Sequence, residues 1–399
     1  MDNYVPYHMH TWDSNLFTIM DSVTNYKMYV DKAVECGMKA LAFSEHGNVV
    51  GWINKKKYCE EKGLKYIHAV EAYVTKSLDE KIRDNRHIVL IARNWEGVKE
   101  INKLMSHKIA CNRKDGHFYY NPRITIDELI NTSDNIIITS ACLGGILNHD
   151  DEEMKEKFIT FLNNNSDRCF LEIQHHDIPD QIRYNKELYE LSQNIGVRLI
   201  AGTDTHSLDE TRVKGVELLQ IAKNSKYNEE EGSMDLSFKT YEQLIKAYKE
   251  QNSLPMNVVK EAINNTNVMA DMVEEFELDK SIKYPKLYDN GLEILKQRIR
   301  EGLQYRRSNL EGIFSKKEIS DRINMELKVI KQIGAVDFIL LEDYVKSNAR
   351  ANHIGYGYSR GSCSGSFICY LLGITEINSL KWNMNFFRFM NPERVSLCD

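Results

Sequence analysis

The sequence predicts an α/β protein whose first part is a barrel of strands surrounded by helices and whose second part is a smaller α+β unit. Two observations support this fold class. Short apolar runs alternate with helical patterns over roughly the first 210 residues, and side chains able to bind metal follow several of those runs. Ligands delivered from the carboxyl ends of buried strands are typical of a parallel α/β barrel.

The expected strands are short apolar or β-branched runs bounded by polar residues. They cover 5–8, 39–43, 65–74, 87–92, 135–139, 169–174 and 197–202. Apolar residues recur at helical spacing between them, in the segments 24–36, 52–61, 96–106, 152–162 and 181–194. This strand-then-helix order favours a barrel of seven or eight βα units.

After about residue 210 the pattern becomes helical. Amphipathic segments cover 258–275 and 292–305, and Ser315 to Glu318 forms a capping box that opens a further helix. The proline- and glycine-containing stretch 282–291 is the expected linker. We therefore expect a domain over 1–280, with a helical extension after about 210, and a second domain over 285–399.

Composition limits the kind of protein. The chain has 399 residues, 42% hydrophobic and 28% charged, with a net charge of −6. It lacks an apolar run near the roughly 20 residues that span a bilayer, and its amino terminus does not resemble a secretory signal. The eight cysteines form no CxxC pair, so we expect reduced thiols and a cytoplasmic location without membrane contact.

A set of potential metal ligands is spread over two hundred residues. Its members are His8, His10, His46, Glu71, His87, Cys142, Asp204 and His206. The first two share a face of an extended segment, because side chains alternate with period two. Histidine with carboxylate suits zinc, manganese or iron, and Glu71 is placed to bridge two ions. A multinuclear site of this kind predicts hydrolysis of a phosphoester.

The motifs around these residues resemble the PHP (polymerase and histidinol phosphatase) domain family. The matching segments are 8–11, 44–47, 71–74, 140–145 and 204–206. The resemblance implies a distorted seven-stranded barrel holding two to three divalent metal ions. Residues 118–123 and the Cys142 motif are more narrowly similar to bacterial DNA polymerase III alpha subunits, some of which have 3′–5′ exonuclease activity.

The resemblance implies nine ligands: His8, His10, Asp21, His46, Glu71, His87, Cys142, Asp204 and His206. Asp13 is a rival to Asp21, because the segment between them looks like an insertion. Glu45 is expected to support His46 and not to bind metal itself. Catalysis is assigned to five of the nine, namely His8, His10, Glu71, Asp204 and His206.

A second resemblance lies near the carboxyl end. Segments 355–366, 370–375 and 391–396 are similar to the start of the polymerase III alpha palm. Its glycine- and serine-rich loop would bind the triphosphate of a dNTP through Arg360, Gly361, Ser362, Gly365 and Ser366. The loop departs from the family at Tyr358–Ser359 and Cys363–Ser364.

The predicted palm stops before the carboxylates that would bind Mg²⁺ for nucleotidyl transfer, with Asp399 matching a residue ahead of them. We therefore expect a partial palm that cannot synthesise DNA alone. The predicted function is a metal-dependent 3′–5′ exonuclease within a polymerase III alpha-like protein, with DNA primer–template and dNTP as ligands. A complementary polymerase chain and a sliding clamp are the expected protein partners.

Two alternatives stay open. One is a phosphomonoesterase like histidinol phosphatase, although such an enzyme has no need of Arg360, Gly361 and Ser362. The other is a catalytically silent scaffold of a split polymerase, in which bound metal only stabilises the fold.

Overall fold

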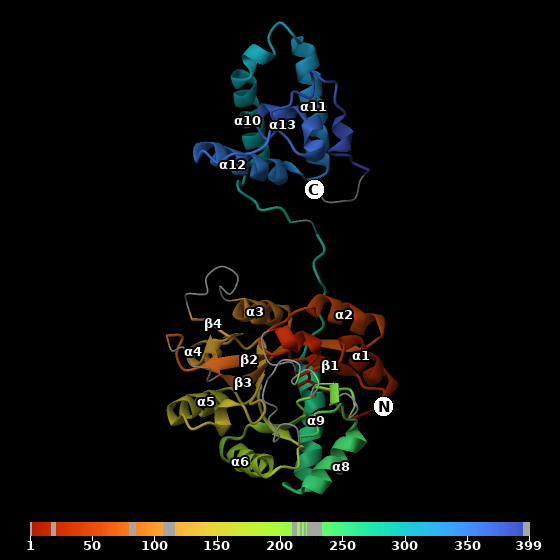
Figure 1. Ribbon diagram of the computed structural model, residues 1–399, viewed down its shortest axis with the longest axis vertical. Coiled ribbons are helices and arrows are strands. Elements are labelled where there is room, and N and C mark those ends of the chain that lie inside the picture. The colour runs from red at the N-terminus through yellow and green to blue at the C-terminus, as the bar shows by residue number, and fades with distance from the viewer. Residues whose placement is uncertain are drawn as a thin grey trace. The chain divides into compact units, whose positions relative to one another are not determined.

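The computed structural model divides into two compact units, Met1–Glu277 and Leu278–Asp399 (Figure 1). The structure describes residues 2–16, 21–79, 85–106, 116–209, 214–215, 218, 221, 234–281 and 283–393. The first unit contains a curled mixed sheet with helices around it, and the second is built from helices. The α/β fold class predicted for the chain is confirmed.

The main sheet of the first unit has seven strands. They are β1 (Ala40–Phe43), β2 (Lys65–Thr75), β3 (Arg86–Ala92), β6 (Ile124–Thr125), β7 (Ile136–Thr139), β8 (Cys169–Gln174) and β9 (Arg198–Gly202). Their order is β1-β2-β3-β7-β8-β9, with β6 paired to β2 outside this path. A separate hairpin contains β4 (Phe118–Tyr119) and β5 (Asn121–Pro122). Six of the seven expected strands therefore form.

The remaining expected strand, residues 5–8, is extended but is not a regular strand. This segment and the residues that follow it still join the two edges of the sheet. On one side the N–H of Ala42 donates to the carbonyl of Pro6, at 2.9 Å. On the other, the N–H of Thr205, just after β9, donates to the carbonyl of His8 at 3.0 Å, and the N–H of His10 donates back at 2.7 Å. The amino-terminal segment thus closes the curled sheet between β1 and β9.

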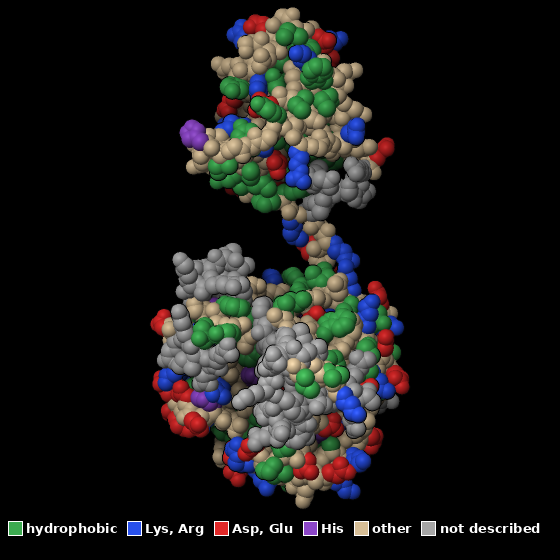
Figure 2. All heavy atoms as spheres, in the orientation of Figure 1, with side chains coloured by type: hydrophobic (Ala, Val, Ile, Leu, Met, Phe, Trp, Pro, Cys, Tyr) green, Lys and Arg blue, Asp and Glu red, His purple; other side chains and the backbone are tan. Residues whose placement is uncertain are grey.

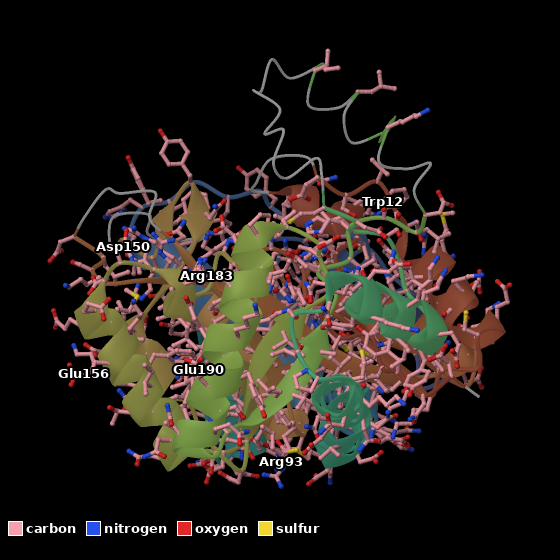
Figure 3. All side chains as sticks on the ribbon, turned by 90° about the horizontal axis from the view of Figure 1, so that it is seen from below. Trp12, Arg93, Asp150, Glu156, Arg183 and Glu190 are labelled. Carbon is pink, nitrogen blue, oxygen red and sulfur yellow. The ribbon has the colours of Figure 1, made fainter. Side chains whose placement is uncertain are left out.

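The expectation of an all-parallel barrel was wrong at one strand. β3 runs antiparallel to both β2 and β7, whereas β1–β2, β7–β8 and β8–β9 are parallel. In Figure 3, Trp12 and Asp150 lie at one end of the first unit and Arg93, directly after the carboxyl end of β3, lies at the other. The reversed strand therefore presents its amino-terminal end, where His87 is the second residue, at the edge where the parallel strands end.

Helices surround this sheet (Figure 1). Those that the structure describes in the first unit are α1 (Tyr26–Glu35), α2 (Trp52–Glu61), α3 (Trp95–Met105), α4 (Ile126–Ile130), α5 (Glu152–Asn164), α6 (Pro179–Ile195), α8 (Tyr241–Gln251) and α9 (Met256–Met272). Single 3₁₀ turns lie at Trp12–Leu16 and Ile146–Asn148. The helical segments predicted from apolar periodicity are confirmed, because tertiary packing buries the same apolar stripes that define them.

Alternate strand residues form two apolar clusters. Leu41, Val70 and Leu90 pack outward in the larger cluster, which also contains helix residues such as Val30 and Phe158. The intervening residues form an inner cluster of Ala40, Ala42, Ile67, Ala69, Val89, Ile91, Phe170 and Ile200, with Met269 and Ala270 of α9 packed against it. Because side chains alternate with period two, Glu71 and His87 continue the inner face beyond its apolar part. The barrel interior is therefore apolar at one end and polar at the other.

The second unit packs helices around its own core. They are α10 (Gly291–Tyr305), α11 (Lys316–Gln332), α12 (Val336–Ala351) and α13 (Phe367–Leu371), with 3₁₀ turns at Arg307–Asn309, Gly361–Gly365 and Phe386–Arg388. Ser315 and Glu318 form the predicted capping box of α11. Residues 283–393 contain no strand, so the sheet part of the α+β expectation is not seen in this described stretch.

The surface is mixed in charge. On the face drawn in Figure 2, lysine and arginine side chains are interspersed with aspartate and glutamate in the described residues of both units. This agrees with a chain whose opposite charges nearly balance. In the part of the chain that the structure describes, no helix is both long enough and apolar enough to cross a bilayer.

Candidate metal centre

The nine expected ligands converge at the polar end of the barrel. Three groups of three have donor atoms within 4.8 Å of one another: His10, His46 and His206; His8, His10 and Asp204; and Glu71, His87 and Cys142. The ninth, Asp21, joins the first group, with Oδ2 2.9 Å from His46 Nε2 and 3.6 Å from His206 Nε2. Residues nearly two hundred positions apart thus form one cluster.

Glu71 lies at the centre of this cluster. Its Oε2 atom is 2.5 Å from Nδ1 of His46. Its Oε1 atom is 2.8 Å from Nδ1 of His87 and 3.4 Å from Nε2 of His8. The Cys142 thiol lies 3.3 Å from the same His87 nitrogen. The two carboxylate oxygens therefore face different histidines, which is the arrangement that a bridging ligand requires.

Asp204 is another carboxylate that contacts two histidines of the cluster. Its Oδ1 atom lies 3.1 Å from His10 Nε2 and 3.3 Å from His8 Nε2. The Nδ1 of His206 is 2.8 Å from the backbone carbonyl of Asp204, which directs Nε2 of that ring toward the cluster. Asp204 adopts a φ of +46°, and Ala141, just before Cys142, adopts +59°. Left-handed backbone at non-glycine residues is uncommon and is concentrated at functional sites.

The choice between Asp21 and Asp13 depends on which carboxylate has another partner. Asp13 Oδ2 lies 2.9 Å from Nζ of Lys55, a buried lysine that also bonds to Glu45. Asp21 lies against two cluster histidines instead. The geometry therefore favours Asp21 as the ninth ligand. The sequence could not decide this, because both aspartates lie in the stretch that follows His10 and neither has a motif of its own.

Buried polar atoms test whether this cluster suits a cation. His8 Nε2, His10 Nε2, Asp21 Oδ1 and Asp204 Oδ1 are buried without hydrogen-bond partners. Such atoms are costly unless something else binds them. Histidine, carboxylate and thiolate donors suit divalent transition metals, and a cation among them would satisfy all four orphaned atoms. The residues present fit two to three divalent ions.

Electrostatics supports the same interpretation. Burial together with His46 and His206 lowers the pKa of His10 to about 4, so this ring is neutral and able to bind metal. Burial acts to raise the pKa of Glu71, but His87 and His46 hold that pKa well below its ordinary value. The pKa of the Cys142 thiol is raised by burial and by Asp204 and Glu71. A bound cation reverses that last effect, because it stabilises the thiolate.

The cluster is open on one side. The side chains of His8, His10 and Glu71 are fully buried, whereas those of Asp204, His87 and Asp21 keep exposures of 16%, 26% and 28%. A substrate could reach the ions from this side. Sites that only stabilise a fold are usually closed by protein ligands, and catalytic sites keep an open position.

Several supporting residues were not predicted. Glu172 contacts the ring of His8, and Ser14 lies 3.1 Å from Nδ1 of His10 and 2.5 Å from Glu45. Glu45 is not among the ligands, as expected, and bonds to Thr11, Ser14 and Lys55. Glu172 had one available signal: it follows the inner-face residue Phe170 by two positions on β8.

Histidines outside the cluster are also buried. The mid-strand position of His68 in the sequence favours a packed ring, and its ring nitrogens lie 3.0 Å from the Tyr66 hydroxyl and 3.1 Å from Asn102 Oδ1. His176, for which the sequence favours a rim or substrate-facing position, is only 2% exposed, and His175 beside it is 3% exposed. They belong to none of the three ligand groups.

The five residues of the predicted triphosphate loop fall into two groups. Arg360, Gly361 and Ser362 are exposed. Gly365 and Ser366 are buried, and the Ser366 hydroxyl donates to Glu326 at 2.7 Å and accepts the N–H of Cys369 at 3.1 Å. Only the exposed group is placed to contact a ligand, and the buried group attaches the loop to the core.

Glu326 of α11 is the attachment point. It is fully buried and accepts the N–H groups of Phe367 and Ile368 at 2.8 and 3.0 Å, while Arg322 lies 2.6 Å away. Replacing Glu326 with alanine is expected to destabilise the second unit by about 3–5 kcal/mol, because Arg322 and two amides lose their buried partner. Hydrogen–deuterium exchange should rise in 361–374 and stay unchanged in β7–β9. The exposed Glu311 replaced with alanine is the control, and equal exchange in both variants would contradict the role of Glu326.

A curled α/β barrel with histidine, carboxylate and thiol groups at one rim is the arrangement of a PHP domain, and residues 6–176 match the family model of that name. Residues 293–399 match the model of the bacterial DNA polymerase III alpha NTPase domain. The resemblance to the bacterial DNA polymerase III alpha subunit, expected from the sequence, is confirmed in both units.

Similarity to such subunits extends along the whole chain. The DNA polymerase III alpha subunit of Borreliella burgdorferi is 32% identical over 98% of this chain and 34% of its own length. That of Aquifex aeolicus is 32% identical over 100% of this chain and 36% of its own length. The chain therefore spans about a third of the length of these relatives.

Two solved structures share weaker likeness. A protein named as a metal-dependent phosphoesterase, from Bifidobacterium adolescentis, is 13% identical with a TM-score of 0.36. An amidohydrolase from Chromobacterium violaceum is 13% identical with a TM-score of 0.34. Each alignment covers 54% of this chain and 96% of the other. The likeness is too weak to inform the site.

Proposed function

We propose that the first unit is a metal-dependent phosphoesterase that removes nucleotides from the 3′ end of DNA. The observation that carries the proposal is a cluster of nine candidate ligand groups in which Asp204, His87 and Asp21 are partly exposed and the others are buried. An open, ligand-rich cluster is suited to catalysis. Similarity to DNA polymerase III alpha subunits supports DNA as the substrate.

The ligand groups would have different roles in the site. Zinc, manganese or iron ions held there would supply a Lewis acid that polarises the phosphoester and activates water. His8, His10, His206 and Glu71 are among the residues that would hold the ions. Asp204, which faces two of these histidines and is partly exposed, lies where bound ions and a substrate phosphate would meet.

The second unit would bind the triphosphate of a dNTP. Arg360 offers a planar guanidinium suited to phosphate oxygens, and Gly361 and Ser362 lie exposed beside it. Gly365 and Ser366, also expected in this role, would act by fixing the loop. Nucleotidyl transfer itself would need Mg²⁺, carboxylates to hold it, a primer–template and partners such as a complementary chain and a sliding clamp. We also propose that the protein is cytoplasmic.

Two substrates separate the proposed exonuclease from a phosphomonoesterase. The metal-loaded chain should release nucleotides one at a time from a primer carrying a mismatched 3′ end, and should act poorly on histidinol phosphate. A duplex whose 3′ terminus is blocked by a phosphorothioate linkage is the matched control and should resist release. Activity on the monoester with none on DNA, after metal has been restored, would overturn the exonuclease and favour the alternative.

A further inference from the structure

Glu172 of β8 contacts the metal centre through His8. Its Oε1 atom lies 2.6 Å from Nδ1 of His8, and both side chains are fully buried. The opposite nitrogen of the ring, Nε2, faces Asp204 Oδ1 at 3.3 Å and Glu71 Oε1 at 3.4 Å. One edge of the imidazole therefore meets Glu172 and the other edge meets the ligand cluster.

Hydrogen bonds fix both oxygens of this carboxylate. The Gln174 amide donates to Oε1 at 2.8 Å, and the Thr139 hydroxyl donates to Oε2 at 2.8 Å. The backbone N–H of Glu172 donates to the Ser140 hydroxyl at 2.8 Å. An ionised carboxylate can only accept hydrogen bonds, so in its contact with Glu172 the Nδ1 atom of His8 must be the donor and must carry a proton. The Nε2 lone pair then points at the cluster.

With the ring proton on Nδ1, the Nε2 lone pair would face two carboxylate oxygens at 3.3 and 3.4 Å. Either a second ring proton or a bound cation removes the repulsion between these atoms, and a cation at Nε2 would take the place of that proton. His8 Nε2 is buried without a hydrogen-bond partner. Carboxylates that bind the far nitrogen of a ligand histidine fix its tautomer and raise its basicity.

We propose that Glu172 is a positioning residue of the metal centre, which holds His8 with Nε2 free to bind an ion. The inference rests on the proposed metal site and adds a tenth functional residue to its nine ligands. It also explains a glycine on the neighbouring strand. A Cβ atom at Gly202 would lie 2.1 Å from Oε1 and 2.4 Å from Cδ of Glu172. Only glycine at this position leaves room for the carboxylate.

Two substitutions disturb the carboxylate independently. Glu172→Gln keeps the size of the side chain but removes its charge, and its amide can donate to Nδ1 and so move the ring proton to Nε2. Gly202→Ala keeps the charge but displaces the carboxylate by steric contact. Thr139→Val removes a single hydrogen bond and is the mildest change. Glu190→Gln makes the same charge change on the exposed surface of α6 and is the matched control (Figure 3).

The experiment measures Co²⁺ and Zn²⁺ binding to the metal-free full chain by competition with a chromophoric chelator. Glu172→Gln and Gly202→Ala should weaken the affinity for at least one ion by about 10–100-fold, and should change the visible absorption of bound Co²⁺. Thr139→Val should weaken it less. Glu190→Gln should match the unchanged chain, and circular dichroism should confirm the fold of each variant.

The outcomes separate this inference from the proposed function. Wild-type affinity and Co²⁺ absorption in both Glu172→Gln and Gly202→Ala would overturn the role of Glu172. If Glu172→Gln does not fold, wild-type affinity in Gly202→Ala and Thr139→Val overturns it equally. Weakened binding in these variants, with no release of nucleotides from DNA by the unchanged chain, would support Glu172 and overturn the exonuclease. Failure of the unchanged chain to bind metal would overturn both.

Discussion

Replacing Asp204 with asparagine is expected to reduce nucleotide release from a DNA 3′ end by more than about 100-fold, a larger loss than the removal of a residue that only supports a ligand. The carboxylate lies 3.1 and 3.3 Å from two ligand histidines, and its loss removes the charge that attracts an ion to this side of the cluster. Asparagine is nearly isosteric and tolerates the left-handed φ of +46° at this position. The fold should therefore survive.

The measurement is single-turnover release of the terminal nucleotide, with circular dichroism and metal content determined on the same sample. Asp271→Asn, which changes an exposed aspartate on α9 that pairs with Lys39, is the control and should leave the rate unchanged. Asp21→Asn should act in the same direction as Asp204→Asn, and Asp13→Asn should not. Full activity in Asp204→Asn would refute the assignment of the catalytic centre.

Removal of metal is expected to lower the melting temperature of the first unit alone. Saturation with an ion at about a thousand times its Kd stabilises a fold by roughly 4 kcal/mol. At about 2–4 °C per kcal/mol for a domain of this size, a chelator should lower the melting temperature by roughly 8–16 °C. Only the first unit should be affected, because buried carboxylates and unpartnered ring nitrogens face one another there in the absence of a cation.

Differential scanning calorimetry with and without chelator provides the measurement, and the second unit supplies an internal control. Its core is separate from the barrel, so its transition should not move. Restoring metal should restore both the melting temperature and nucleotide release. A melting temperature that recovers while the rate stays at zero would favour the scaffold interpretation, in which metal serves the fold only.

Much of the architecture was predictable because it depends on local pattern. The helix Trp52–Glu61 and the capping box at Ser315 follow from apolar spacing and from side-chain hydrogen bonds within one turn. Six strands follow from short apolar runs. The segment 5–8 was harder, because it bonds to Ala42 and Thr205 without the regular pairing of a strand.

The candidate ligands could be proposed from the sequence because their residue types suit metal binding and because several of them follow or begin a strand. Their supports were not. The histidine nearest to Glu172 in the sequence is His175. The histidine that Glu172 contacts is His8, which is 164 positions away. Likewise, Ser366 seemed suited to bind phosphate until its hydroxyl proved to be bonded to Glu326, 40 residues away.

The sequence by itself determined the α/β class and the residue types of the candidate metal ligands, because these depend on composition, periodicity and motif. It predicted the helices of the second unit, but also a sheet that the described residues 283–393 do not contain. Only the tertiary structure decided that β3 is reversed, that Asp21 and not Asp13 faces the histidines, and that Glu172 holds His8. Each of these depends on which side chains meet across the barrel. Those side-chain contacts depend on the packing of the whole sheet, and no local sequence pattern predicts them.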